Sequence, residues 1–358
     1  MAGLLDPIRL GEIECRNRIA MAPCTRCMSP GFVPTDAVAA YYERRAADGV
    51  GLLITEGTVI CERGNGYPDV PGIFAPEQIT AWRKVTDGVH AAGGKIICQI
   101  WHVGAIAHPL TTGGVLPESP SGRSPAGDIK RLRRPDGSYE HYGESETISE
   151  DRIHELIDLY RQAAANSIEA GFDGVEIHGA HGYLIDAFIN LHWNRREDDW
   201  GGENRTRFAR EVARAVVDEI GAGRTQMRIS PVMSVSGEAW QKPEETFPRL
   251  LTDLHEAGLR TLHISNLDYD EAILPASLCG GDSSARISMH EAARALWSGQ
   301  IIGVGSLTVD RADRAISDGE IDMAAFGRSL IANPDFVSRL RAETGLENYR
   351  PEMLETLV

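Results

Sequence analysis

The stretch Val175-Glu176-Ile177-His178-Gly179-Ala180-His181-Gly182-Tyr183 lies near the middle of the 358-residue chain and decides how the rest is interpreted. Its apolar residues alternate with Glu176 and His178 at the two-residue period of a β-strand, which places His178 at the carboxyl end of that strand. Glycines beside the histidines let a flat ligand approach the backbone closely. If a helical turn begins near residue 180, the tips of His178, His181 and Tyr183 converge on one small volume.

Three interpretations of this cluster stay open from its residues alone. A His-x-x-His pair can bind a metal, but two imidazoles are too few ligands and the sequence shows no third at a recognisable spacing. The histidines can instead hydrogen-bond the rim of the fold, or they can hold the oxygen of a ligand beside a phenol. Because a phenol has an ordinary pKa of about 10, Tyr183 is protonated at neutral pH and suits a proton donor better than a base.

Outward from this stretch, apolar strands and amphipathic helices alternate along the chain. The eight predicted strands span 19–25, 52–59, 95–102, 174–181, 227–233, 261–266, 301–306 and 323–328. Predicted helices span 35–49, 76–93, 151–171, 204–220, 244–257, 288–298, 308–318 and 333–343, and several end at glycine. Strict β-α alternation predicts a parallel sheet, and eight such units close as an α/β (β/α)8 TIM barrel. We expect one such domain over 1–358, with an N-terminal hairpin plug at 7–18.

Residues 103–150 interrupt the alternation after the third strand. They are rich in Pro, Gly and Ser and too long for an ordinary loop, so we expect a lid insertion, an excursion over the barrel mouth. Within it, the turn sequence at 135–138 predicts a hairpin between 129–134 and 139–142. The basic run at 130–134 either protects an exposed hairpin edge or binds the phosphates of a nicotinamide dinucleotide.

A double charge reversal tests the second role of the basic run. Changing Arg131 and Arg134 to Glu should raise the Michaelis constant for NADPH, because the phosphates would then face like charges. Steady-state kinetics with varied NADPH measures this effect, and an unchanged Michaelis constant would end the idea.

Composition and charge exclude several classes of function. With 36 basic and 52 acidic residues the formal net charge is −16, which disfavours binding to nucleic acid or to an anionic membrane and favours a small-molecule substrate. No apolar run approaches the roughly 18 residues of a membrane span, and we expect a soluble, cytoplasmic protein. The six cysteines are scattered, and the CxxC at Cys24 and Cys27 has no second pair to complete a zinc or iron–sulfur site.

In a TIM barrel the reacting residues lie at the carboxyl ends of the strands. Outside the central cluster, these ends carry Pro23, Cys24, Thr25, Glu56, Gly57, Gln99, Trp101, His102, Arg228, Gly303, Gly305, Gly327 and Arg328. Glycines after the seventh strand, with an arginine after the eighth, fit the phosphate site that such barrels build from their last two loops. Ordinary turn glycines are the alternative.

The chain resembles the Old Yellow Enzyme family of flavin mononucleotide (FMN) ene-reductases from Pro7 to Pro334. The resemblance is carried by NRIAMAPCTR at 17–26, QIWHVG at 99–104, HGAHGY at 178–183, GGENR at 201–205 and AFGR at 325–328. Departures from the family pattern include Ala105 and the loop Leu191-His192-Trp193.

The resemblance implies FMN as cofactor, NADPH or NADH as reductant, and a monomer or homodimer. It implies that Trp101 shapes the substrate pocket, although a tryptophan there can also serve packing alone. Arg228 would stabilise negative charge on the reduced cofactor, and Thr25 would adjust its potential. The implied cofactor-binding residues are Pro23, Cys24, Thr25, Gly57, Gln99, Arg228, Gly303, Gly305, Gly327 and Arg328.

The implied reaction is ping-pong. After NAD(P)H has reduced the flavin and left, an α,β-unsaturated carbonyl or nitro compound binds over the same ring. His178 and His181 hold its oxygen, hydride passes from flavin N5 to the β-carbon, and Tyr183 protonates the α-carbon.

Two alternative functions remain open. A flavin-dependent oxidative demethylase or dienoyl reductase would use the same scaffold. A flavin-free, phosphate-binding TIM-barrel lyase or isomerase belongs to another class; its Schiff-base form would need a lysine at a strand end, and none is found there.

Overall fold

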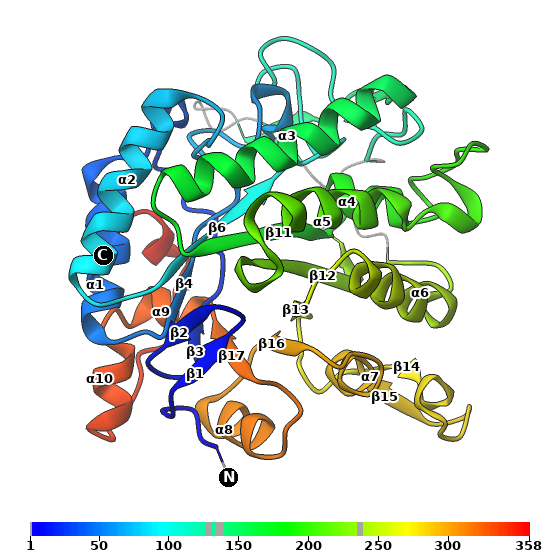
Figure 1. Ribbon diagram of the computed structural model, residues 1–358. Coiled ribbons are helices and arrows are strands. Elements are labelled where there is room, and N and C mark those ends of the chain that lie inside the picture. The colour runs from blue at the N-terminus through cyan, green and yellow to red at the C-terminus, as the bar shows by residue number, and fades with distance from the viewer. Residues whose placement is uncertain (1, 126–130, 134–138, 235–238) are drawn as a thin grey trace.

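Eight parallel strands close into a barrel surrounded by helices (Figure 1), in a computed structural model that describes residues 2–125, 131–133, 139–234 and 239–358. The last strand pairs with the first, and the short β5 (Thr58–Val59) extends the pairing of the second strand with the third. In pairing order the barrel strands are β3 (Ile19–Met21), β4 (Leu52–Ile54), β6 (Ile96–Trp101), β11 (Gly174–His181), β12 (Thr225–Ser234), β13 (Thr261–Ser265), β16 (Gln300–Val304) and β17 (Met323–Phe326). The predicted TIM barrel is therefore confirmed.

The helices follow the strands as the apolar pattern predicted. They are α1 (Asp36–Asp48), α2 (Pro76–Ala91), α3 (Glu150–Glu169), α5 (Arg207–Ile220), α6 (Pro243–Glu256), α7 (Met289–Leu296), α8 (Val309–Ser317), α9 (Arg328–Ala332) and α10 (Phe336–Arg341). The helix predicted at 333–343 is present as the shorter α10, whereas α9 before it was not predicted. The two short helices are separate because Pro334 disfavours helical backbone at Asn333. A further short helix, α4 (Leu184–Ile189), supplies the helical turn expected after the central stretch.

The N-terminal hairpin closes the amino end of the barrel. Its strands β1 (Ile8–Leu10) and β2 (Ile13–Cys15) are antiparallel, and their side chains join the buried apolar cluster inside the barrel. The Gly11 N–H donates to Oε1 of Gln300, which begins β16, over 2.7 Å. A side chain at Gly11 would place its Cβ 2.3 Å from the carbonyl oxygen of Gly223, so only glycine fits. The carboxyl end of the barrel is left for the site.

The excursion contains the predicted hairpin. β8 (Arg131–Arg133) pairs antiparallel with β9 (Tyr139–His141), while the turn at 134–138, with Arg134, lies outside the described residues. β7 (Glu118–Ser119) and β10 (Glu146–Thr147) form a second, parallel pair. Another hairpin, β14 (Ala272–Pro275) with β15 (Arg286–Ser288), precedes α7.

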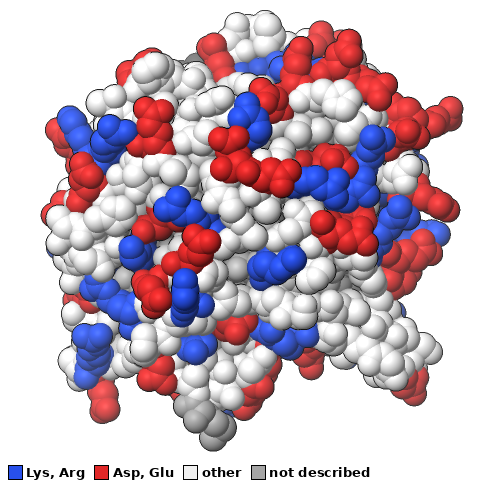
Figure 2. All heavy atoms as spheres, in the orientation of Figure 1, with Lys and Arg blue, Asp and Glu red and all other residues white. Residues whose placement is uncertain are grey.

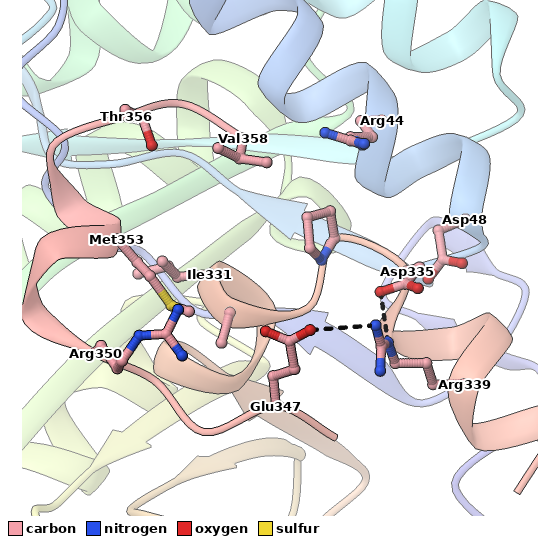
Figure 3. A pocket seen from close by; sticks show the side chains of 12 residues that line it. Arg44, Asp48, Ile331, Asp335, Arg339, Glu347, Arg350, Met353, Thr356 and Val358 are labelled. Carbon is pink, nitrogen blue, oxygen red and sulfur yellow. Dashed lines mark hydrogen bonds and ion pairs between the residues drawn. The ribbon is translucent and has the colours of Figure 1, made fainter. Parts of the chain in front are cut away.

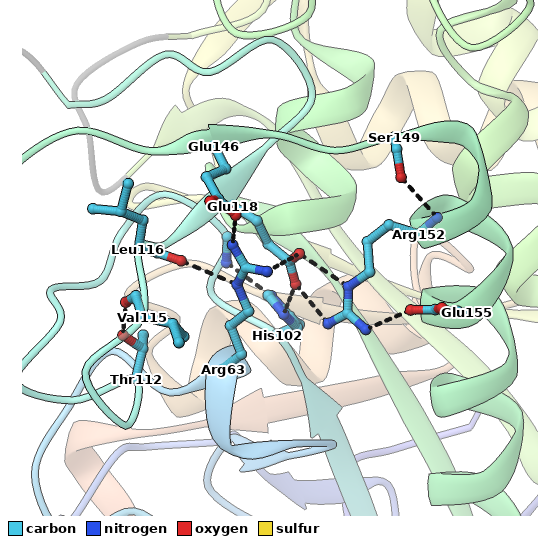
Figure 4. A network of polar contacts seen from close by, with 11 residues as sticks. Arg63, His102, Thr112, Val115, Leu116, Glu118, Glu146, Ser149, Arg152 and Glu155 are labelled. Atoms are coloured by element: carbon cyan, nitrogen blue, oxygen red, sulfur yellow. Dashed lines mark hydrogen bonds and ion pairs between the residues drawn. The ribbon is translucent and has the colours of Figure 1, made fainter.

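Glu118 fastens the excursion to the barrel (Figure 4). Its carboxylate lies 3.0 Å from Nε2 of His102 and accepts hydrogen bonds from Arg152, and it forms an ion pair with Arg63. Burial opposes a charged His102, but its hydrogen bonds with Cys61 and Glu118 raise its pKa to about 9. His102, grouped with the strand-end site residues by sequence, is therefore an anchor for the excursion.

The surface carries both signs of charge. Acidic and basic side chains are interspersed on the face shown in Figure 2. Within the described ranges, no helix is both long enough and apolar enough to cross a membrane.

Candidate active site

Two imidazoles and a phenol converge at the carboxyl end of β11. The ring of His178 lies 5.2 Å from that of His181 and 5.0 Å from that of Tyr183, and the rings of His181 and Tyr183 are 6.5 Å apart. The sequence prediction that these three side chains meet is thus seen in the structure. Their chemical roles remain predictions.

An irregular backbone brings the three side chains together. The register of β11 with β12 shifts between Gly179 and His181, and His181 adopts a left-handed conformation with φ 66°. Such a conformation is unfavourable for a residue with a Cβ and persists only where its surroundings hold it. The His181 N–H donates to Oγ of Ser230 (2.8 Å), and the Gly182 N–H donates to the buried carboxyl of Asp186 (2.5 Å). These two bonds fix the turn that presents the cluster.

Trp101 forms one wall of the cluster. Its indole stacks on His178 with 5.9 Å between ring centroids and meets the edge of Tyr183 at 4.9 Å. A Cβ at Gly57 would lie 2.0 Å from the indole, so Gly57 is required for the packing of Trp101. The hydroxyl of Tyr67 lies 2.9 Å from that of Tyr183, and sequence reasoning had not singled out Tyr67.

The protonation states suit hydrogen-bond donation to a ligand oxygen. Burial, together with the nearby positive charge of Arg228, lowers the pKa of His178 to about 3, so this imidazole is neutral. Its Nδ1 accepts a hydrogen bond from the Ala180 N–H (3.3 Å), which leaves the proton on Nε2. Burial raises the pKa of Tyr183 well above its ordinary value, so the phenol keeps its proton.

Arg228 is a buried cation beside the cluster. One of its terminal nitrogens donates to Oγ of Ser265 (3.0 Å), and that hydroxyl also lies 3.1 Å from Nε2 of His181. Nε of Arg228 has no hydrogen-bond partner within the described part of the chain, although it is buried. A buried donor without a partner is costly, so this nitrogen favours a polar or anionic ligand at this place.

A cavity of about 210 Å³ opens beside Arg228 at the carboxyl ends of β3, β12, β13, β16 and β17. Two arginines, Arg228 and Arg328, line it. Two separate positive charges fit a ligand that carries both a polar ring edge and a phosphate. Five of the predicted cofactor-binding residues line the cavity: Pro23, Cys24, Arg228, Gly327 and Arg328. It is also lined by residues that the sequence had not indicated, among them Asn266, Leu267, Ser306 and Ser329. The residues present therefore fit FMN.

The other predicted cofactor-binding residues, Thr25, Gly57, Gln99, Gly303 and Gly305, do not line this cavity. Gln99 is buried and bonded to Glu176, whereas Thr25 is exposed next to Cys24. A Cβ added at Gly303 would lie 3.0 Å from the ring of Tyr269, and one added at Gly305 would lie 2.7 Å from the backbone nitrogen of Tyr269. At Gly303 such a Cβ would also lie 2.9 Å from the side chain of Ile321, so packing against Ile321 and Tyr269 accounts for the two glycines, and their phosphate role stays a prediction.

A larger hollow lies away from this cluster, between α1 and the C-terminal segment (Figure 3). Its volume is about 540 Å³, and three of its charged side chains pair with one another: Arg339 contacts Asp335 at 2.8 Å and Glu347 at 3.7 Å. None of the predicted site residues lines it, so we assign it no part in the reaction.

Two departures from the family pattern meet in space. Ala105 and Trp193 pack with Ala187 of α4 in one small buried cluster. Because α4 follows directly after Tyr183, a substitution at Ala105 or Trp193 would change the packing of the helix that positions the Tyr183 phenol.

Glu56 carries a prediction about pH. Its buried carboxyl accepts hydrogen bonds from the Arg26 and Cys27 N–H groups, and burial raises its pKa from 4.5 to about 7. A raised folded-state pKa contributes stability that is present below about pH 4.5 and lost as the pH rises through about 7. Glu56→Gln stays neutral, so its free energy of unfolding should fall less between pH 5 and pH 8 than that of the wild type, by on the order of 2 kcal/mol.

Urea denaturation of both proteins at the two pH values measures this difference. Parallel losses of stability would show that Glu56 does not titrate in this range.

Comparison with known proteins gives concordant matches over nearly the whole chain. The family model described as the NADH:flavin oxidoreductase / NADH oxidase family matches residues 3–347. The chain is 39% identical over 356 residues to 12-oxophytodienoate reductase 7 of Oryza sativa subsp. japonica, a match that covers 97% of this chain and 90% of that protein.

It is 36% identical to 12-oxophytodienoate reductase 2 of Arabidopsis thaliana, covering 97% of this chain and 90% of that protein. Among solved structures, the old yellow enzyme homologue from Zymomonas mobilis superposes with a TM-score of 0.88 at 33% identity, covering 98% of this chain and 96% of that chain. Morphinone reductase in complex with tetrahydroNAD superposes with a TM-score of 0.88 at 33% identity, covering 99% and 94%.

Proposed function

This chain belongs to the NADH:flavin oxidoreductase / NADH oxidase family and is an FMN-dependent ene-reductase of the Old Yellow Enzyme family, and we propose that His178, His181 and Tyr183 are its catalytic residues. The observation that carries this proposal is the meeting of two imidazoles and a protonated phenol beside a buried arginine. Membership of this flavin-dependent family rules out the alternative considered from the sequence, a flavin-free lyase or isomerase. No observation favours the demethylase or dienoyl reductase.

The substrate class follows from chemistry and from the relatives. Those relatives are named as reductases of 12-oxophytodienoate and of morphinone, and we propose α,β-unsaturated carbonyl or nitro compounds for this chain. Bound FMN supplies hydride transfer from NAD(P)H to the alkene. The residues that would hold it are Pro23, Cys24, Thr25, Gly57, Gln99, Arg228, Gly303, Gly305, Gly327 and Arg328.

The side chains of this protein then hold the oxygen and move one proton. His178 donates from Nε2 and His181 from its imidazole to the substrate oxygen, which withdraws electrons from the double bond. Tyr183 gives its hydroxyl proton to the α-carbon, and Trp101 limits the space available to the substrate. The expected monomer or homodimer and the expected cytoplasmic location stay predictions.

A two-step experiment tests this function. Purified protein should be yellow, or become so with added FMN. NADH or NADPH should bleach it in a stopped-flow instrument, and a panel of enones, nitroalkenes and amines should then restore the colour selectively. Reoxidation by enones or nitroalkenes is the expected result, and a protein that stays colourless with FMN would overturn the proposal.

A further inference from the structure

Glu176 is a buried carboxylate that the reaction described above leaves unused. It precedes His178 by two residues on β11, so both side chains point into the barrel. Its two oxygens accept hydrogen bonds from Nε2 of Gln99 (2.7 Å) and Nε2 of Gln226 (2.6 Å), and Nδ1 of His263 lies at 2.8 Å. Three strands, β6, β12 and β13, thus each contribute one nitrogen to one carboxylate.

This carboxylate is ionised. Burial opposes the charged form, but the interactions with His263, Arg228 and Gln226 hold the pKa of Glu176 below its ordinary value. Burial lowers the pKa of His263, so this imidazole is neutral and donates its Nδ1 proton to the carboxylate. Glu176 therefore brings one full negative charge into the barrel interior.

The negative charge lies close to the charge of Arg228. The register pairs Arg228 with His178 on one side and with His263 on the other, while Glu176 pairs with Gln226 two positions earlier. Among the described residues Arg228 forms no ion pair. Burial lowers the pKa of Arg228, and of the groups that oppose this shift Glu176 has the largest effect. Glu176 is thus the compensating anion for the buried guanidinium.

Glu176 also fixes the orientation of Gln99. An ionised carboxylate accepts hydrogen bonds and donates none, so the NH2 group of Gln99 must face Glu176. The amide then turns its carbonyl oxygen, an acceptor, to whatever lies on its other side. A ligand edge that donates an N–H is the complement of this arrangement.

We propose that Glu176 is a positioning residue that sets the electrostatic environment of the cofactor: its negative charge offsets the positive charge of Arg228, and its oxygens orient the amide of Gln99. The inference rests on the proposed function, because it concerns the same site. With Glu176 present, the positive charge that Arg228 offers to a reduced, anionic cofactor is partly cancelled. Without that carboxylate, the reduced form should bind relatively more tightly.

The test is the midpoint potential of the FMN holoenzyme. Glu176→Gln removes the charge at nearly constant volume. It should raise the ratio of affinities for reduced and oxidised FMN at least tenfold, which for a two-electron couple corresponds to about 30 mV. A spectroscopic titration against a dye of known potential measures this shift without any turnover.

A matched control separates charge from packing. Gln226→Met removes one of the hydrogen bonds to the carboxylate but keeps its charge, so the affinity ratio should change less than twofold. If Glu176→Gln fails to fold because Arg228 is left unpaired, Arg228→Met and Arg228→Met/Glu176→Gln repeat the comparison without the buried cation. The double variant should again show at least a tenfold higher ratio than the single one.

The outcomes distinguish this inference from the proposed function. Equal potentials with and without the Glu176 carboxylate, or an equal shift in Gln226→Met, would overturn the role of Glu176 while the flavin remains bound. Protein that binds no FMN in any form would overturn the proposed function itself.

Discussion

Tyr183→Phe slows reoxidation of the reduced enzyme by cyclohexenone by about 10²- to 10⁴-fold, the range expected for loss of a positioned general acid, and leaves reduction by NADPH nearly unchanged. The phenylalanine ring retains the contacts with Trp101 and His178, whose centroids lie 4.9 and 5.0 Å from the tyrosine ring. Only the hydroxyl is lost. Because reduction by NADPH needs no proton from this side chain, the two half-reactions should separate in stopped-flow measurements.

Tyr67→Phe is the matched control for this variant. It removes the hydroxyl that lies 2.9 Å from the hydroxyl of Tyr183 but leaves the proposed proton donor in place. Its effect on reoxidation should be much smaller than that of Tyr183→Phe. Equal losses in both half-reactions of Tyr183→Phe would remove the proton-donor role.

His178→Ala and His181→Ala should each weaken the binding of phenols, which mimic the enolate, by about 10- to 150-fold. That range corresponds to one lost hydrogen bond to a charged oxygen, worth about 1.5 to 3 kcal/mol. His178 is neutral with its proton on Nε2, so it can donate to an anion without itself carrying charge. Titration of the FMN-bound protein with a substituted phenol measures both the affinity and the long-wavelength charge-transfer band.

The band should disappear in both variants. His90→Ala, on α2 and paired with Asp173 away from the cluster, serves as a control that keeps the wild-type affinity. A charge-transfer band that persists in both active-site variants would argue against an oxygen site at these imidazoles.

The barrel could be predicted because its signal is local and repeated. Each strand is an apolar run, and several helices end at a glycine that the sequence shows directly. At Gly49, for example, the left-handed backbone with φ 103° ends α1. Strand ends were less predictable: residues 22–25 continue the small, apolar pattern of β3 but leave the sheet, and Pro23 and Cys24 line the cavity instead. Hydrophobicity does not distinguish these two uses.

The candidate site was predictable where its residues follow strands, and not where they come from irregular segments. Tyr67 lies between β5 and α2 in a segment without periodicity, so only the folded chain brings its hydroxyl to Tyr183. Ser230 and Ser265 are common residues whose importance appears only through their bonds to His181. The anchoring role of His102 could not be predicted for the same reason, because its partner Glu118 belongs to the irregular excursion.

The absence of a side chain at Gly57 has a consequence for protein engineering. Since the smallest possible addition there would overlap the indole of Trp101, the two positions cannot be diversified independently. A mutant library that varies residue 57 alone should yield almost exclusively collapsed pockets. One that pairs each larger residue at 57 with a smaller ring at 101 reshapes the wall against which incoming alkenes are sorted by size.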